Sequence, residues 1–83
     1  SFDNASLKST TFETCTMTKS TFRKAIIEES MFMSITGGSM DFTGAKITGS
    51  TFRGCALKKA KFNNCDLKGA YFKKSDLCGA DFT

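Results

Sequence analysis

The 83-residue chain contains no histidine, no tryptophan and no proline, and it has a single tyrosine. Without histidine, the chain cannot supply the imidazole base of a Ser–His or Cys–His mechanism. Without proline, every peptide unit keeps its N–H group, which is then free to donate to a neighbouring strand. The composition therefore excludes two common catalytic mechanisms and suits a hydrogen-bonded β structure.

Motifs for catalysis, cofactors and metals are missing as well. No phosphate-loop or dinucleotide-binding glycine motif occurs, and the four cysteines lack the paired spacing of a zinc site. The acidic residues are scattered, so no carboxylate pair is placed for acid–base catalysis. No apolar run is long enough to span a membrane, and no signal-peptide pattern opens the chain. We therefore expect a non-enzymatic protein with no catalytic, cofactor-binding or metal-binding residues.

What the sequence has instead is a five-residue period without insertion or deletion. A large apolar residue, here called the centre, occupies every fifth position, and all nine phenylalanines fall on every second centre. The centres are Phe2, Leu7, Phe12, Met17, Phe22, Ile27, Phe32, Gly37, Phe42, Ile47, Phe52, Leu57, Phe62, Leu67, Phe72, Leu77 and Phe82. Only Gly37 departs from the pattern. A small residue, here called the minor partner, lies two positions before most centres.

A period of five fits neither an α-helix nor a straight strand. Five residues advance an α-helix by about 140°, which would scatter the centres around its circumference. In a straight strand, successive centres would point to opposite faces. The chain must instead turn once per repeat, as in a solenoid, so that all centres point inward. In the second half, Gly or Asn recurs two positions after a centre, which indicates a corner that requires positive φ.

The repeats resemble those of the pentapeptide-repeat proteins, whose units read roughly A(D/N)LxG. The best-matching units are Cys65-Asp66-Leu67-Lys68-Gly69, Ser75-Asp76-Leu77-Cys78-Gly79 and Ala80-Asp81-Phe82. The first half departs from this consensus, with Thr, Ser or Lys where Asp or Asn is usual. The resemblance implies an all-β fold, a right-handed quadrilateral β-helix (β-solenoid) with four pentapeptides per turn. The chain would then form about four coils, with no caps within it.

Both ends of the chain fall inside the repeat pattern. We therefore expect residues 1–83 to form a single pentapeptide-repeat β-helix domain that is a fragment of a longer protein. Coils of twenty residues predict two opposite columns of rings, namely Phe22, Phe42 and Phe62 in one and Phe32, Phe52 and Phe72 in the other.

The empty centre at Gly37 has oversized neighbours, because Ile35 and Met40 stand where minor partners are expected. We expect these two side chains to fill the space that a leucine would have taken. The alternatives are a bulge or a hinge at Gly37-Gly38.

Apolar residues of the second coil occupy positions that should point outward, namely Ile26, Met31 and Met33. Stacking by twenty places Met31 in one column with Thr51 and Tyr71. Contiguous exposed apolar surface often marks a contact site, and methionine adapts to varied partners. We therefore predict a contact surface of Ile26, Met31, Met33 and Tyr71. The alternative is an irregular coil that turns Met31 or Met33 inward.

Charge is unevenly distributed along the chain, whose formal net charge is +4. The segment 46–74 holds eight basic residues and a single acidic one. We predict a basic strip on the last two coils, formed by Arg53, Lys58, Lys59, Lys61, Lys73 and Lys74. Such a strip can hold a polyanion, an anionic lipid surface or an acidic protein. The alternative is a solvated face, in which lysines oppose aggregation.

The cysteines favour a reducing compartment. Cys15, Cys55 and Cys65 are minor partners and should lie inside, where a thiol behaves as a small apolar group. Cys15 and Cys55 share a column two coils apart, about 10 Å, which is too far for a disulfide. Only Cys78 should point outward. We expect a cytoplasmic location, either in a bacterium or, for a secreted effector, in its host.

These features predict a non-enzymatic structural scaffold or protein–protein interaction module. Its partner would be an unidentified protein, and the uncapped ends would also allow end-to-end association. The resemblance implies two alternatives. In one, the β-helix is the substrate-recognition arm of a larger secreted bacterial effector enzyme, such as a ubiquitin ligase. In the other, it is a DNA-mimicking, DNA gyrase-binding protein of the quinolone-resistance type. That type depends on an extended acidic surface, whereas the strip predicted here is basic.

Overall fold

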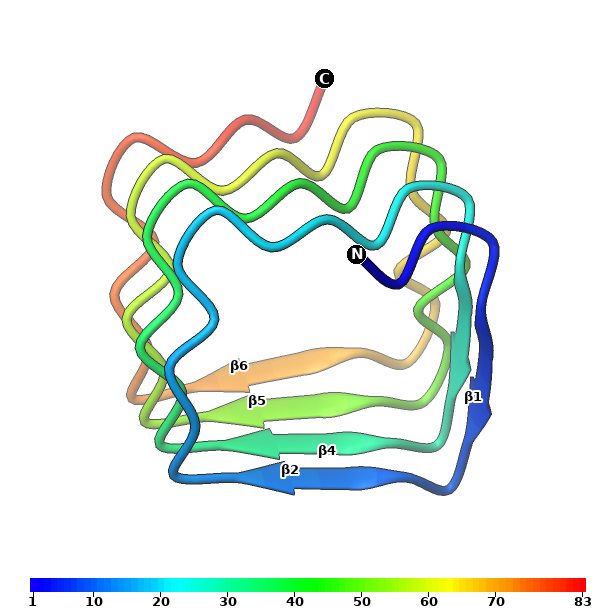
Figure 1. The fold of residues 1–83 in the computed structure, drawn as a ribbon, viewed down its shortest axis with the longest axis horizontal. Coiled ribbons are helices and arrows are strands. Elements are labelled where there is room, and N and C mark those ends of the chain that lie inside the picture. Colours follow the sequence, from blue (N-terminus) through cyan, green and yellow to red (C-terminus); the bar gives the residue numbers. More distant parts are fainter.

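The computed structural model describes residues 1–83 and shows an all-β solenoid with four walls (Figure 1). In Figure 1 the chain winds clockwise as it recedes from the viewer, so the coil is right-handed. Residues that pair between coils are twenty positions apart, as Phe32 and Phe52 are. The Cα extents of 24 × 23 × 23 Å describe a block about as long as it is wide. The structure has no helix that could cross a membrane.

Six short strands form the regular parts of two walls, and all of their pairings are parallel. The strands are β1 (Ser6–Lys8), β2 (Thr11–Glu13), β3 (Ile26–Glu28), β4 (Met31–Met33), β5 (Thr51–Arg53) and β6 (Tyr71–Lys73). One sheet has the order β1-β3 and the other β2-β4-β5-β6. Single bridges such as Thr16↔Thr36 and Asp41↔Lys61 join the coils elsewhere. The four-stranded sheet is therefore the most regular wall (Figure 1).

Two columns of phenylalanine rings meet in the middle of the core, which also contains aliphatic residues such as Ile27, Ile47 and Leu57. Within a column the rings stack, as Phe32 does on Phe52 with centroids 4.6 Å apart and planes 6° apart. Between the columns they meet edge to face, as Phe42 and Phe52 do at 5.8 Å and 88°. Both are favourable arrangements of aromatic rings. The predicted columns are confirmed, and none of the six rings named for them is exposed.

The corners have one backbone conformation along the whole chain. Every residue two positions after a centre, from Asn4 to Gly79, has a positive φ, between 51° and 73°. The first half adopts this conformation without glycine, at residues such as Thr14 and Glu29. The predicted corner geometry is thus confirmed, and it extends into the half of the chain that lacks the consensus residues.

Two hydrogen-bonding patterns close these corners. At one kind, the Ala45 N–H donates to the Phe42 carbonyl at 2.9 Å and closes a β-turn. The other kind follows the β3 strand and its equivalents. There, a buried serine hydroxyl forms hydrogen bonds with backbone groups. The Ser50 hydroxyl accepts from the Ser30 N–H at 3.1 Å and donates to the Ile27 carbonyl at 3.0 Å. Burying these hydroxyls costs little, because both of their hydrogen-bonding roles are satisfied.

The consensus aspartate has a local role in the repeats that contain it. Asp66 Oδ1 accepts from the Lys68 N–H at 3.1 Å, and Asp76 Oδ1 accepts from the Cys78 N–H at 3.0 Å. Asp and Asn side chains commonly accept from a backbone N–H two residues on. The aspartate side chain therefore provides a hydrogen-bond acceptor for a backbone N–H that points outward.

The chain passes Gly37 without a bulge. The Gly37 N–H donates to the Ala56 carbonyl and the Ser39 N–H to the Lys58 carbonyl, both at 2.8 Å, so the ladder of inter-coil bonds continues. The Met40 sulfur occupies the space into which a Cβ on Gly37 would project. Ile35 and Met40 are fully buried. The predicted volume compensation is confirmed for Met40, whereas Ile35 is shown only to be buried.

Candidate interaction surface

The outward side of the four-stranded sheet, here called the four-strand face, presents two parallel columns of side chains. Because the phenylalanine of each strand points into the core, the residues on either side of it must point outward. One column is Thr11, Met31, Thr51 and Tyr71, and the other is Glu13, Met33, Arg53 and Lys73. The face therefore changes from acidic through apolar to basic along the solenoid axis.

The apolar residues of the predicted contact surface fall on two walls. Met31 and Tyr71 lie on the four-strand face, 40% and 61% exposed, and Met33 is half-buried there. Ile26 is 42% exposed but belongs to β3, in the neighbouring sheet. The second coil is regular, and neither Met31 nor Met33 turns into the core. The structure thus places three of the four residues on one sheet.

The cations of the four-strand face have no acidic partner. Arg53 lies beside Lys73 in the register of β5 and β6, and Lys74 follows at the corner. All three side chains are exposed. The protein's three ion pairs lie elsewhere, joining Arg23 to Asp3 and to Asp41, and Lys46 to Glu28. The positive charge of this face is therefore available to an external anion.

The rest of the predicted basic strip turns away from this face. Lys58 and Lys59 belong to the next wall and its corner, and Lys61 lies one wall further on. Lys61 stands between Asp41 and Asp81 in its column, so acidic residues flank it on both neighbouring coils. The six basic residues consequently follow a curved path across three walls, and Arg53, Lys73 and Lys74 are the ones next to the apolar residues.

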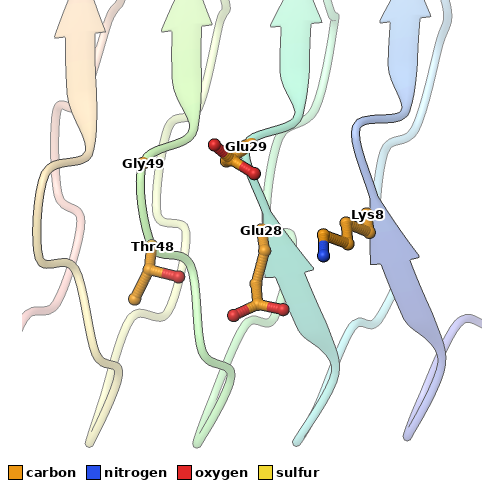
Figure 2. Close-up of a pocket in the computed structure, with 5 residues that line it drawn as sticks. All are labelled: Lys8, Glu28, Glu29, Thr48 and Gly49. Carbon is orange, nitrogen blue, oxygen red and sulfur yellow. The ribbon is translucent and has the colours of Figure 1, made fainter.

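A shallow depression of about 300 Å³ lies on the wall of β1 and β3, lined by Lys8, Glu28, Glu29, Thr48 and Gly49 (Figure 2). No apolar side chain lines it. Figure 2 shows the Lys8 side chain extending from β1 toward Glu28 of β3. Sequence reasoning did not identify this depression, although Lys8, Glu28 and Thr48 lie at the twenty-residue spacing. Its open, polar lining is unlike the mostly apolar lining of pockets that bind small organic ligands.

The interior thiols support the backbone. The Cys55 thiol donates to the Phe32 carbonyl at 3.1 Å, and the Cys65 thiol donates to the Phe42 carbonyl at 2.7 Å. Burial raises the pKa of both thiols, which keeps them protonated and poorly nucleophilic. Cys15 is half-buried, whereas Cys78 is exposed, as the repeat pattern predicted.

Comparison with models of known protein families agrees with this architecture. A family model described as "Pentapeptide repeat region" matches residues 5–82. Among solved structures, the chain is similar to a pentapeptide repeat protein (Rfr23) from the cyanobacterium Cyanothece 51142, with 12% sequence identity and a TM-score of 0.36. That match covers 95% of this chain and 65% of the other, so this chain spans less than two thirds of that protein's length. No curated protein matches the chain.

Proposed function

The chain belongs to the pentapeptide-repeat family, and we propose that its β-solenoid is a scaffold that binds a protein partner through the four-strand face. The observation that carries this proposal is the position of Met31, Met33 and Tyr71 beside the unpaired Arg53 and Lys73. Aromatic residues, methionine and arginine are enriched in the cores of protein interfaces, whereas lysine and acidic residues are depleted there. The apolar centre of the face thus resembles an interface core with a charged rim.

The scaffold part of the proposal is supported by how the chain uses its polar groups. The Ser30 and Ser50 hydroxyls and the Cys55 thiol, which could otherwise act as nucleophiles, are buried and bonded to backbone carbonyls. A nucleophile needs an adjacent base and access to substrate. These groups stabilise the corners, which fits a non-enzymatic role.

The sheet also suits binding because of how it is supported. Behind the outward residues of β4, β5 and β6 lie the stacked rings of Phe32, Phe52 and Phe72, which fix the strand positions. Side chains on a preorganised surface lose less freedom on binding than those on a mobile loop. The buried thiols of the same core are compatible with a reducing compartment, where we propose that the protein works.

Photocrosslinking tests the proposal. Benzoylphenylalanine would replace Thr51, in the middle of the four-strand face, or Thr16, an exposed residue on the adjacent wall. We expect a discrete protein adduct in cells from the Thr51 site alone. The adduct should disappear when Met31→Asp and Met33→Asp are added, while circular dichroism shows an intact fold.

Two results would contradict the proposal. One is equal adduct formation from Thr16 and Thr51. The other is an adduct from Thr51 that survives both methionine substitutions.

A further inference from the structure

We infer that the partner of the four-strand face is an acidic protein segment with a large apolar side chain. This inference rests on the proposed function and specifies the chemistry of the partner. Along one column of the face, Met33 is followed by Arg53 and Lys73 on successive strands. Adjacent strands lie about 4.8 Å apart, so Arg53 is about 5 Å and Lys73 about 10 Å from Met33 along the column.

The order of side chains on the face dictates an order in the segment. An apolar residue of the partner would cover Met31 and Met33 of β4, and carboxylates would face Arg53 of β5 and Lys73 of β6. Arginine pairs with a carboxylate through two parallel N–H donors, which fixes orientation as well as charge. Lys74 at the adjoining corner adds a third exposed cation.

The neighbouring apolar surface strengthens this pairing. Exposed ion pairs contribute little because water screens them. Arg53 is the direct strand neighbour of Met33, so an apolar side chain seated on Met33 would exclude water from one side of the guanidinium. The two contacts are therefore expected to depend on each other.

The same face suits a nucleic acid or an anionic membrane less well. Glu13 pairs with Met33 in the register of β2 and β4, so a negative charge stands at the apolar end of the basic column. The continuous phosphates of a nucleic acid or the headgroups of a membrane would be repelled by the Glu13 carboxylate. A short protein segment that covers only β4, β5 and β6 would not reach it. Tyr71 is the chain's only exposed aromatic residue apart from the terminal phenylalanines, which gives single-stranded bases little to stack on.

Binding of defined polymers to the purified chain tests the inference. The probes are poly-glutamate, a glutamate–tyrosine copolymer of equal length, oligo-dT, and phosphatidylcholine vesicles containing phosphatidylserine. The copolymer should bind about tenfold more tightly than poly-glutamate, because only it offers apolar side chains. It should also bind more tightly than the oligonucleotide or the vesicles. The opposite order would overturn the inference in favour of a phosphate-bearing partner.

Two sets of variants assign the binding to this face. Replacing Arg53, Lys73 and Lys74 together by glutamate should weaken copolymer binding by about tenfold or more. The matched control is Lys8→Glu, Lys19→Glu and Lys24→Glu, which changes the net charge equally on other walls and should have a much smaller effect. Equal losses in the two triple variants would overturn the inference, because attraction by net charge alone would then explain binding.

The contribution of the apolar residues of the four-strand face is tested with separate variants. Met31→Ser with Met33→Ser should reduce the affinity for the copolymer to that for poly-glutamate, whereas Ile26→Ser on the neighbouring sheet should not. Unchanged copolymer binding in the double serine variant would overturn the inference. A Thr51 crosslink that depends on both methionines but survives the Arg53, Lys73 and Lys74 reversal would leave the proposed function standing and the acidic partner wrong.

Discussion

The two halves of the solenoid, residues 1–40 and 41–83, reach the same backbone by different sequences. The first half has no glycine at any corner. Most corners of the second half are glycines, namely Gly44, Gly49, Gly54, Gly69 and Gly79. A left-handed corner costs a residue other than glycine about 1–2 kcal/mol. The first half nevertheless adopts positive φ at every corner. The stacked core and the inter-coil bonds must therefore impose the corner, and glycine only relieves strain.

The two halves also differ in the charged and apolar residues on their surface. Glu28, Glu29 and the exposed Met31 lie in the first half, whereas the cations of the four-strand face, Arg53, Lys73 and Lys74, lie in the second. The corner conformation, the stacked rings and the inter-coil hydrogen bonds continue through both halves. The proposed binding function therefore depends on the outward columns, which differ between the halves while the corner conformation does not.

The largest expected effect tests whether the two halves are equally well packed, by removing one phenylalanine ring from each half. Phe32 and Phe52 are both fully buried and stack on each other. Replacing either by alanine should lower the free energy of unfolding by about 3–5 kcal/mol, through lost burial and a cavity. Urea denaturation would measure both losses, and Phe12→Ala at a half-buried position should cost less. A much smaller loss for Phe32→Ala than for Phe52→Ala would show that the first half is loosely packed.

A second test restores the missing centre of the first half. Gly37→Leu alone would place its side chain onto the Met40 sulfur, and such overpacking should cost about 1–3 kcal/mol. Met40→Ala alone should leave a cavity and cost about 2–5 kcal/mol. The double variant should be more stable than the sum of the two losses predicts, as thermal or urea unfolding would show. Additive losses would mean that Met40 does not fill the Gly37 site.

Much of this architecture could be predicted from the sequence, because the repeat never changes length. A constant period fixes which side chains point inward, so the phenylalanine columns and the exposed Cys78 followed directly. The two kinds of corner did not follow, since a buried serine such as Ser50 reveals its role only when its carbonyl partner is placed. The basic strip was predicted from the excess of basic residues in the segment 46–74 and from the stacking of the coils. The same twenty-residue spacing also places Lys61 between Asp41 and Asp81, which the prediction did not take into account.

A third test exchanges corner residues within one column. Thr14 and Gly54 occupy equivalent corners two coils apart, with φ of 53° and 62°. Thr14→Gly should stabilise the protein and Gly54→Thr should destabilise it, each by about 0.5–1 kcal/mol after the entropic cost of glycine is subtracted. A Cβ at Gly54 would meet nothing closer than the Ser34 hydroxyl oxygen at 3.9 Å, so steric contact would not obscure the result. Equal stability of Thr14→Gly and the original chain would mean that the first half carries no corner strain.

The smallest expected effect concerns two aspartates, one in each half. A hydrogen bond from the Arg23 N–H, at 2.9 Å on the next coil, lowers the pKa of Asp3 below its ordinary value of 3.8. In the second half, hydrogen bonds from the Thr83 hydroxyl and N–H, at 2.7 and 3.0 Å, lower the pKa of Asp81. A lowered folded-state pKa contributes stability above the ordinary value and loses it as the pH falls through the folded value.

The two carboxylates should differ in how strongly their titration is linked to folding. The partner of Asp3 is on another coil and is lost on unfolding, whereas that of Asp81 is two residues away and can partly persist in the unfolded chain. NMR titration of the carboxyl carbons, folded and in urea, should therefore show a larger pKa difference for Asp3. Asp3→Asn should correspondingly remove more of the acid-dependent loss of stability below 3.8 than Asp81→Asn does. An Asp3 carboxyl that titrates at the same pH in both states would show that its inter-coil bond does not hold in solution.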